Sequence, residues 1–520
     1  MNNQPDSIST YLPVTRIYTA LVSLVLSVFA FYSDDLINSD GIMYLQMAQA
    51  FLDGGFSATQ QIYDWPFFSI LVAGFHSVSS LSLGLSAVII NSGLFVLLTD
   101  ALLLISSKLV SSRIQLITAA ILILSFFPIN EYRDFIVRDL GYWAFCSVAL
   151  YQFIKFIEQP KLGTATYWQV AISLAILFRV EGIVILIALP LYSFFIYKPF
   201  DAIKHSIQLS YLVILAAAIL GTTVIGQSGL EAAFGKLSSL TNYINFEHFS
   251  RRLAKNSDII ANKVLNHYSA EYSTMILVAG LLYMLLFKLI KAFSFYYIAL
   301  SGISLWREKK LLISAIQPFF IYFITVNFLI LTIFLFKQYF ISSRYAVMLI
   351  IALLMLFLPV ITQTIERAWT QKHKPVAILI TLLIVASVID GFSQSNSKSY
   401  IKETARWASD NLPADAYALT DDQFIHYYFT SNAPNATLCV GPVYQKAEDV
   451  DYRGVTAEQY EKCRPYTKQG YHAFDYLIVV EKHKHHQLKA FLETANVQSL
   501  FELDNQRGNK AVVYKIMGKQ

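Results

Sequence analysis

The sequence predicts an α-helical, multi-pass membrane protein of about eleven spans, followed by a small extracytoplasmic α/β domain. Three observations support this fold class. Of the 520 residues, 55% are hydrophobic and only 14% are charged, and the mean hydropathy of +0.49 is high for a soluble protein. Apolar runs long enough to cross a hydrocarbon core of about 30 Å recur from residue 14 to residue 391. After residue 391, short strand-like and helical patterns of a water-soluble domain replace them.

The spans are assigned from hydropathy in chain order. They cover residues 14–32, 85–106, 114–129, 141–157, 167–180, 182–197, 207–226, 273–305, 311–335, 345–364 and 375–391. No small-residue cleavage site follows the first run, so we expect a retained helix and not a removed signal peptide. Lys288 and Lys291 interrupt residues 273–305, which we count as a single crossing because the flanking charges then stay consistent. Residues 66–82 are apolar but rich in serine, and we expect them at the membrane interface.

The basic residues orient these spans. Lysine and arginine are enriched in cytoplasmic loops. Here they fall in alternate short loops at Lys108, Arg113, Lys155, Lys161, Lys198, Lys204, residues 307–310, Arg367, Lys372 and Lys374. We therefore expect a protein of the inner (cytoplasmic) membrane with a cytoplasmic N-terminus and a periplasmic C-terminal domain. The formal net charge of +5 is spread over these loops, so it does not indicate nucleic-acid binding.

The chain is predicted to divide into a transmembrane domain, residues 1–391, and a soluble domain, residues 392–520. In the soluble domain we expect helices at residues 400–413 and 485–495, strands at 416–420 and 476–481, and a hairpin at 497–516 that turns at residues 507–509. Cys439 and Cys463 form either a disulfide, as suits an oxidising compartment, or two free thiols. Cys146 lies in a span, where we expect it only to pack.

Ionisable residues collect at the outer ends of the spans, and four separate segments contribute them. Because charged side chains are costly at membrane depth, their presence indicates a function. They are Asp34, Asp35 and Asp40 after the first span, Glu131, Arg133, Asp134, Arg138 and Asp139 before the fourth, Arg179 and Glu181 between the fifth and sixth, and Arg344 before the tenth. We expect one site, assembled at the outer membrane surface.

The first of these segments, "DDLINSDGIMYLQMAQAFLDGG" (residues 34–55), holds four aspartates and no lysine or arginine. Asp40, Tyr44 and Met47 follow helical spacing on one face, which predicts a short amphipathic helix in the membrane interface. In the simplest interpretation, Ser39 or Asp40 caps this helix. Capping does not explain why the segment lacks basic residues. A catalytic role for Asp40 therefore remains the alternative to capping.

The other three segments combine arginine with acids. In "NEYRDFIVRDLGYWAF", Arg138 and Asp139 either form a local ion pair or leave the arginine to bind an anionic group, because a guanidinium offers two parallel donors to phosphate. In "FRVEG", Arg179 either pairs with Glu181 or points into the same cavity. In "SSRYAVML", Arg344 either anchors the span at lipid headgroups or is a second phosphate ligand.

Taken together, "SDGIMYLQMAQAFLDGG", "YRDFIVRDLGYWAF", "FRVEG" and "SRY" resemble the GT-C superfamily of membrane glycosyltransferases over about residues 14–365. The likeness is greatest to its family 39-like branch of protein mannosyltransferases and lipid A aminoarabinose transferases. The resemblance implies sugar transfer from a polyprenyl-phosphate-linked donor on the outer membrane face, with Asp40 and Asp139 as the catalytic carboxylates. Gly41 follows Asp40 where many relatives carry glutamate, so metal use and the acceptor stay open.

The residue types suit this chemistry. Transfer from a lipid phosphate needs a base for the acceptor's proton and cations for the leaving phosphate. We expect Asp40 to be the base of an inverting transfer without a covalent enzyme intermediate. Substrate binding is assigned to Arg138, Arg344, Arg179, Glu181 and Tyr44. The expected partners are the polyprenyl-phosphate-sugar donor, a glycan, lipid or protein acceptor, and the lipid bilayer, but no nucleic acid. No cofactor is certain, and a divalent metal stays an option.

Three other functions remain as alternatives. A polytopic transporter or lipid flippase would place polar groups near the membrane midplane and carry inverted repeats, and neither is evident. An O-antigen ligase or polymerase also acts on polyprenyl-linked sugars, but the acidic first loop and the terminal α/β domain argue against it. A catalytically silent scaffold would leave Asp40 dispensable. The sequence holds no Walker A, G-x-G-x-x-G or H-E-x-x-H motif.

Overall fold

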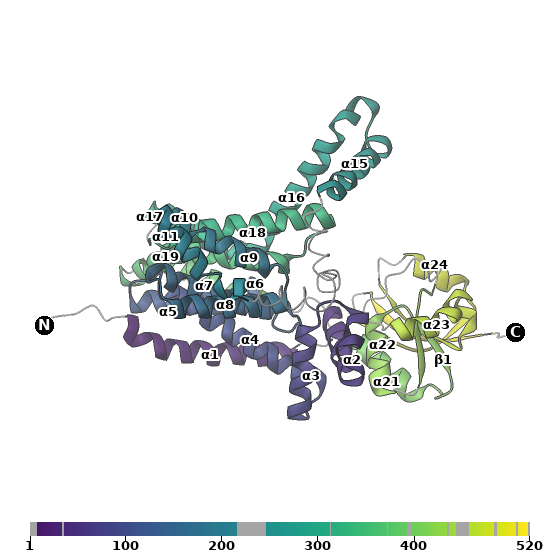
Figure 1. Ribbon diagram of the computed structural model, residues 1–520. Helices are drawn as coiled ribbons and strands as arrows, with labels where there is room; N and C mark the ends of the chain where they lie inside the picture. The colour runs from purple at the N-terminus through teal and green to yellow at the C-terminus, as the bar shows by residue number, and fades with distance from the viewer. Residues whose placement is uncertain are drawn as a thin grey trace. The chain divides into compact units, whose positions relative to one another are not determined.

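A computed structural model describes residues 8–33, 36–215, 246–311, 314–371, 373–392, 398–433, 436–443, 457–482, 486–505 and 508–517 (Figure 1). The chain forms two compact units. The first consists of Met1–Leu24, Leu94–Tyr132 and Asp139–Phe392, and the second of Val25–Gly93, Arg133–Arg138 and Ser393–Gln520. The segment 34–55 thus groups with the C-terminal residues. The predicted domain boundary between residues 391 and 392 stays a prediction.

The first unit is built from helices. In chain order they are α1 (Ile8–Ser33), α4 (Leu83–Ser106), α5 (Arg113–Leu124), α6 (Phe127–Asn130), α7 (Asp139–Glu158), α8 (Leu162–Phe178), α9 (Gly182–Leu191), α10 (Ser193–Ile196), α11 (Pro199–Gln208), α15 (Phe246–Lys263), η1 (His267–Tyr272), α16 (Ser273–Phe293), α17 (Phe295–Glu308), α18 (Gln317–Gln338), η2 (Ser343–Ala346), α19 (Val347–Thr370) and α20 (Lys374–Phe392). The last third of α1, from Val25, and the first half of α4, up to Gly93, belong to the second unit. Helix α19 is apolar on nearly all sides, as a helix in a protein interior should be, and it packs against α5, α17 and α18.

Seven helices among the described residues are long and apolar enough to cross a membrane. They are Ile8–Ser33, Leu83–Ser106, Asp139–Glu158, His267–Phe293, Gln317–Gln338, Ser343–Thr370 and Lys374–Phe392. Four further apolar helices have only 10–17 residues: Phe67–Ser79, Arg113–Leu124, Leu162–Phe178 and Gly182–Ile196. The predicted fold class, a multi-pass helical membrane protein, is confirmed. The number of full-length spans in the described part of the chain is smaller than the eleven that hydropathy suggests.

Residues 273–305, expected as one continuous crossing, form two helices. Helix α16 ends at Phe293 and α17 begins at Phe295. Between them Ser294 has a φ of 71°, a left-handed conformation that a continuing α-helix excludes. The expectation of one uninterrupted helix is therefore wrong, because hydropathy does not register a change in one backbone angle.

Two other expected membrane segments are only partly testable or shorter than a span. The predicted span 207–226 lies mostly outside the described residues. Only its first part, up to residue 215, is described, and residues 211–215 there are helical. Residues 66–82, expected at the interface, contain the 13-residue helix α3 (Phe67–Ser79). A helix of this length rises about 20 Å, too little for a hydrocarbon core of about 30 Å.

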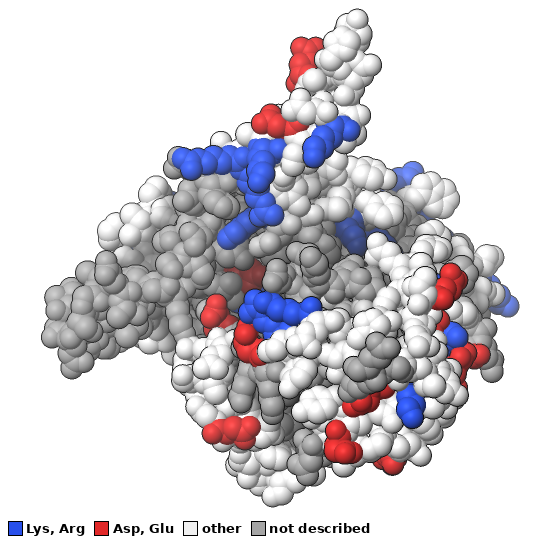
Figure 2. Space-filling model, turned by 90° about the vertical axis from the view of Figure 1, so that its right-hand side faces the viewer, with Lys and Arg blue, Asp and Glu red and all other residues white. Residues whose placement is uncertain are grey.

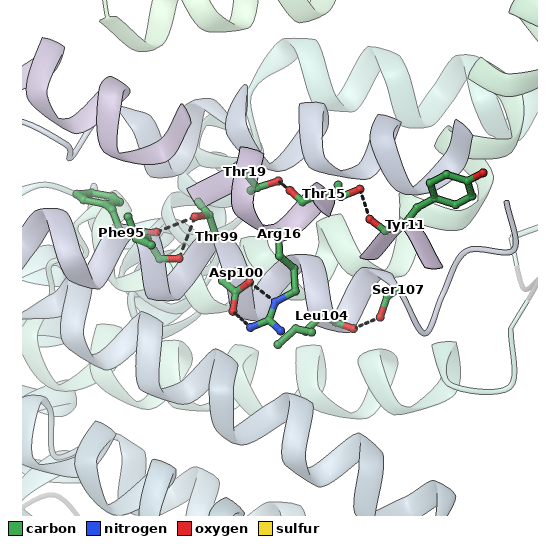
Figure 3. Close-up of polar contacts among 10 residues, drawn as sticks. Tyr11, Thr15, Arg16, Thr19, Phe95, Thr99, Asp100, Leu104 and Ser107 are labelled. Atoms are coloured by element: carbon green, nitrogen blue, oxygen red, sulfur yellow. Dashed lines mark hydrogen bonds and ion pairs between the residues drawn. The ribbon is translucent and has the colours of Figure 1, made fainter. Parts of the chain in front are cut away.

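One ion pair joins two apolar helices of the first unit. Arg16 of α1 donates from Nε and from Nη2 to the two carboxylate oxygens of Asp100 on α4, each at 2.7 Å (Figure 3). Nearby hydroxyls donate to backbone carbonyls of their own helices, at Thr15, Thr19 and Thr99. The pair is bidentate, the geometry in which guanidinium and carboxylate bind each other most strongly.

The second unit carries a five-stranded sheet in the order β2-β1-β3-β5-β4. Its strands are β1 (Tyr417–Thr420), β2 (Thr437–Val440), β3 (Tyr476–Glu481), β4 (Val497–Asp504) and β5 (Lys510–Ile516). The first three are parallel, and β4 and β5 form an antiparallel hairpin in which β5 pairs with β3. Side chains alternate between the two faces of the sheet, so that Ala418 joins one apolar cluster and Leu419 the other.

Helices cover both faces of this sheet. Helices α21 (Ser399–Asn411) and α22 (Gln423–Asn432) pack in the cluster of Ala418, and α23 (Ala457–Lys468) and α24 (His486–Thr494) in the cluster of Leu419. The same unit contains α2 (Ser39–Ile62), α3 and η4 (Tyr471–Ala473). The predicted α/β domain is therefore confirmed.

Most elements of this domain agree with the sequence. The expected helices correspond to α21 and α24, and the expected strands to β1, β3 and the hairpin of β4 and β5, while α22, β2 and α23 were missed. Cys439 and Cys463 form a disulfide with their Cα atoms 5.5 Å apart, which confirms one of the two alternatives. Cys146 is buried, as expected. The hairpin residue Arg507 and the acids Asp34 and Asp35 lie outside the described residues.

Candidate active site

Arg179 is the centre of a buried ion cluster in the first unit. It follows α8 directly, and its guanidinium donates from Nη1 to the carboxylate of Asp139, from Nε to Glu181 Oε2 at 3.2 Å and from Nη2 to Glu181 Oε1. Arg179 is 7% exposed and Asp139 is 2% exposed. Ionic hydrogen bonds of this kind are about twice as strong as neutral ones. The guanidinium is therefore fixed in place by two acids, one of which lies forty residues away in the sequence.

A glycine makes this contact possible. Gly141 lies on α7, two residues after Asp139, and a Cβ atom there would come within 2.2 Å of the Phe178 ring. Phe178 is the last residue of α8 and precedes Arg179. Because Gly141 has no side chain, the end of α8 approaches α7 closely enough for Arg179 to reach Asp139.

A pocket opens beside the ion cluster. Its lining consists of Tyr142 and Trp143 of α7, Arg179 and Glu181 of the turn before α9, Asn327, Ile330, Leu331 and Phe334 of α18, and Arg344 and Tyr345 of η2. The space between these walls is about 410 Å³, including the open mouth. The walls combine apolar and aromatic side chains with two cations, which suits an anionic group attached to an apolar chain.

Both arginines of the pocket contact the ring of Tyr345. The guanidinium carbon of Arg179 lies 4.6 Å from the ring centroid, and that of Arg344 lies 5.4 Å from it. Cations are attracted to the face of an aromatic ring, so the tyrosine helps to fix both groups. Arg344 is the second guanidinium in the lining of this pocket.

Two residues before α7 support the aromatic wall of the pocket. The ring of Tyr132 meets that of Trp143 edge to face at a centroid distance of 5.6 Å. Burial raises the pKa of Glu131 above its ordinary value. Burial, together with the neighbouring Glu131, also raises the pKa of Tyr132, so its hydroxyl stays protonated.

Asp40 belongs to the second unit, where it lies in the first turn of α2. The residue before this helix is Asn38, so Ser39 and Asp40 are its first two residues and not its cap. A carboxylate in the first turn is favoured by the positive end of the helix dipole. The segment is helical, as expected, with Tyr44 and Met47 buried, although α2 has 24 residues and is longer than predicted; its expected place in the membrane interface stays a prediction.

Asn38 joins the start of α2 to residues 133–138. Its Nδ2 donates to the Ile136 carbonyl at 3.3 Å, and the Ile136 N–H donates to Asn38 Oδ1 at 2.8 Å. A Cβ atom at Gly41 would lie 2.8 Å from Asn38 Oδ1 and 3.0 Å from Ile136 Cβ. This close approach explains the glycine after Asp40, because a larger residue would separate the two segments.

The remaining expected site residues make other contacts in the second unit. Arg138 donates from Nη2 to the Tyr63 hydroxyl at 2.8 Å, and its guanidinium lies 4.8 Å from that ring's centroid. Tyr44 packs edge to face against Phe68 of α3 at 5.4 Å. Arg133 is buried, which lowers its pKa to about 9, and it donates to the Ser27 hydroxyl at 2.8 Å. The structure thus brings Asp139, Arg179, Glu181 and Arg344 together in one unit, and places Asp40, Tyr44 and Arg138 in the other.

The sequence did not point to the pocket's aromatic and amide side chains. Tyr142 and Trp143 follow Asp139 by one helical turn, and Tyr345 follows Arg344 directly, so nearness to a charged residue was the available signal. Asn327 has no such neighbour in the sequence. Aromatic residues make up 15% of the chain, and position alone does not separate the lining residues from the others.

The described residues offer no ready site for a metal ion. No group of three His, Cys, Asp or Glu side chains is arranged to hold one within those ranges. The two carboxylates of the ion cluster, Asp139 and Glu181, both bind Arg179 instead. A divalent metal at this cluster would have to displace the arginine.

A second basic surface lies on and beside α15 (Figure 2). Arg251, Arg252 and Lys255 line shallow hollows along this helix. Arg252 also donates to the Lys337 carbonyl of α18 at 2.7 Å. This surface is open to solvent, unlike the pocket around Arg179.

Similarity to known proteins is found among solved structures and not among protein families or curated sequences. No protein-family model matches the chain, and no curated protein sequence is similar to it. Among solved structures, it is similar to the archaeal oligosaccharyltransferase AglB from Archaeoglobus fulgidus, in complex with an inhibitory peptide and a dolichol-phosphate. The TM-score is 0.45 and the sequence identity 14%, over 97% of this chain and 74% of that chain. A similarity of this size does not carry the fold or the activity of that protein over to this chain.

Proposed function

We propose that the protein is a GT-C-type membrane glycosyltransferase, which moves a sugar from a polyprenyl-phosphate-linked donor to a glycan, lipid or protein acceptor. The pocket of the first unit carries the proposal, because it combines Arg344 and Arg179 with the aromatic and apolar walls of α7 and α18. A polyprenyl phosphate has the matching parts, a phosphate that a guanidinium binds and an apolar chain. The resemblance of four sequence segments to GT-C enzymes supports the same reaction.

The two arginines have different roles in this proposal. Arg179 donates from Nε, Nη1 and Nη2 to Asp139 and Glu181, so we assign it a structural role in the wall of the pocket. Arg344 supplies the charge that binds the donor phosphate and stabilises it as the leaving group. Asp139 then acts as a positioning residue, since its carboxylate is buried against Arg179.

The proposed reaction is a single displacement. A nucleophilic oxygen or nitrogen of the acceptor attacks the anomeric carbon of the donor sugar. The bond from this carbon to the phosphate oxygen breaks, and polyprenyl phosphate leaves with the electron pair. The acceptor's proton passes to the carboxylate of Asp40, which acts as general base. The anomeric configuration is inverted, because one displacement occurs without a covalent enzyme intermediate.

The assignment of Asp40 rests on the sequence resemblance and on its setting. Its segment contains no lysine or arginine that would neutralise the carboxylate. Asp40 lies in the first turn of a helix that Asn38 and Gly41 fix to residues 133–138. A base must be held in place to take a proton efficiently.

The transfer assay tests the base. Asp40→Asn keeps the size of the side chain, and we expect sugar transfer to fall about 10²–10⁴-fold, the usual contribution of general-base catalysis, while donor binding persists. Asp53→Asn is the matched control, because Asp53 lies on the same helix, is exposed and only accepts a hydrogen bond from Gln49. A fully active Asp40→Asn protein would show that the base lies elsewhere.

Donor binding tests the pocket. Arg344→Lys keeps the charge but loses the planar pair of donors, so a polyprenyl-phosphate donor should bind about tenfold more weakly. Arg406→Lys, at an exposed position on α21, should bind the donor like the parent. Equal donor binding by both variants would remove Arg344 from the site. Movement of the donor across vesicle membranes without sugar transfer would support the flippase alternative instead.

The proposed location is the inner membrane, with the N-terminus in the cytoplasm and the C-terminal domain in the periplasm. The basic loops support this orientation by the positive-inside rule. Alkaline phosphatase fused after residue 395 should be active, because it folds only outside the cytoplasm, and the same enzyme fused within residues 307–310 should be inactive. An active fusion at residues 307–310 would overturn the orientation.

A further inference from the structure

The chain just before Asp40 enters the apolar core of the C-terminal domain. Leu36 is 6% exposed and belongs to the cluster formed by α21, α22 and the sheet. The next residue, Ile37, donates its backbone N–H to the hydroxyl of Tyr428 on α22 at 2.9 Å. Helix α2, which begins two residues later, packs against α22 as well. Residues far apart in the sequence thus meet directly, within one compact unit.

The position of Tyr428 is fixed by the capped start of α22 and by a contact with Lys402. Helix α22 begins immediately after β1, and its N-cap Asp422 accepts hydrogen bonds from the N–H groups of Phe424 at 2.8 Å and Ile425 at 3.2 Å. The ammonium group of Lys402 lies 5.4 Å from the centroid of the Tyr428 ring. The hydroxyl that accepts the Ile37 N–H therefore belongs to a short, capped helix that follows β1, an inner strand of the sheet.

On its other side the same segment is fixed to residues 133–138. Asn38 exchanges two hydrogen bonds with Ile136, and Gly41 leaves the space for their close approach. Asp40 follows both contacts in the sequence, four residues after Leu36 and two after Asn38. The direction in which α2 starts, and with it the position of the Asp40 carboxylate, depends on both contacts.

We infer that the C-terminal domain is a positioning element for the proposed base, and that Leu36 and Tyr428 are the positioning residues through which it acts on Asp40. This inference rests on the proposed function. The domain contributes by holding the segment before α2, so its removal or loosening lowers the rate of transfer and leaves the donor pocket of the first unit intact. Tyr428 acts only through Asp40.

The first test measures hydrogen exchange at the start of α2 and does not depend on transfer activity. Tyr428→Phe removes one hydroxyl and with it the acceptor for the Ile37 N–H. Loss of one hydrogen bond should raise hydrogen exchange in the first turns of α2 by about 2–10-fold in the full-length protein in lipid nanodiscs. Tyr427→Phe, on the neighbouring residue of the same helix, should leave this exchange unchanged. Equal exchange in both variants and the parent would overturn the positioning role.

The second test connects position with transfer. Tyr428→Phe should lower kcat about 2–10-fold with the KM for the donor unchanged. Leu36→Ala should lower it further, and Leu36→Met, which keeps the apolar volume, should restore a rate close to that of the parent. Any fall of donor affinity in parallel with kcat would instead indicate a general loss of structure and would contradict the inference.

A double variant separates this inference from the proposed function. In the Asp40→Asn background, Tyr428→Phe should cause no further loss of rate, because the residue through which it acts is already disabled. A further loss of the same size would show that Tyr428 acts on another group. If Asp40→Asn alone is fully active, the proposed base is wrong, whereas the exchange result still decides whether Tyr428 holds the start of α2.

Discussion

Removing the carboxylate of Asp100 tests how the first unit carries a charge at membrane depth. Arg16 lies eight residues after the start of α1 at Ile8, and Asp100 lies six residues before the end of α4 at Ser106. At about 1.5 Å per residue, these positions are about 12 Å and about 9 Å from the helix ends. Asp100→Asn therefore leaves Arg16 as an uncompensated cation, because arginine is not deprotonated in proteins.

The exposed fractions of the two side chains set the expected magnitude. Arg16 is 44% exposed and Asp100 is 18% exposed, so part of the arginine can extend toward the headgroups. Breaking a fully buried pair costs about 3–5 kcal/mol. With this partial exposure we expect Asp100→Asn to lower the free energy of unfolding by about 2–3 kcal/mol. Arg16→Gln should cost about 1 kcal/mol, because an unpaired aspartate can take up a proton and become neutral.

Unfolding of the full-length protein in lipid bilayers measures these differences. The series consists of the parent, the two single variants and the double variant with leucine at both positions, which should cost less than about 1 kcal/mol because no charge is left unpaired. Lys108→Gln is the control, since its pair with Glu158 is partly exposed at the helix ends and should change stability by no more than about 0.5 kcal/mol. A larger cost for Arg16→Gln than for Asp100→Asn would refute the reasoning.

Three further outcomes follow from contacts described above. Gly141→Ala should abolish most transfer with the protein still folded, because its methyl group would displace the Phe178 ring and the arginine that follows it; transfer at the parent's rate would contradict this. Replacing Cys439 and Cys463 by alanine should lower the free energy of unfolding of the C-terminal domain by about 3 kcal/mol, the chain-entropy value for a closed loop of this size, as read from denaturant unfolding under oxidising conditions. Burial raises the pKa of Asp421 from 3.8 to about 7, so the folded domain binds an extra proton in this window and loses stability as the pH rises through it. Asp421→Asn should therefore raise the melting temperature at pH 8 and leave it unchanged near pH 3.5. An unchanged melting temperature at both pH values would show that ionisation of Asp421 does not destabilise the folded domain.

The fold was predictable where local patterns determine it. Apolar length identified the long apolar helices of the first unit but not the polar helices α11 and α15, and helical or alternating spacing identified α21, α24, β1 and β3. The break at Ser294 was not predictable, because a single left-handed residue ends the helix inside an apolar run. Helix α22 was missed for a related reason, since its aromatic sequence also suits a strand.

The candidate site was predictable only in part. Placing the loops on one side of the membrane was enough to group Asp139, Arg179 and Arg344, and the pocket brings these segments together. The sequence could not show that Arg179 would take Asp139 as its partner, because that contact depends on how closely two helices approach at Gly141. Arg138 contacts Tyr63 in the second unit, and its expected role in binding an anion stays a prediction.

The bond between Ile37 and Tyr428 also has a consequence for the order of events during synthesis. The two residues are separated by 391 positions in the chain. A ribosome adds about 5–20 residues per second, so the segment before Asp40 leaves the ribosome roughly 20–80 s before its partner exists. During this interval Leu36 has no core to enter, and the Ile37 N–H lacks the Tyr428 hydroxyl as its acceptor. A nascent chain that stops short of residue 428 can insert its helices into the bilayer, yet it lacks one of the two contacts that fix the start of α2.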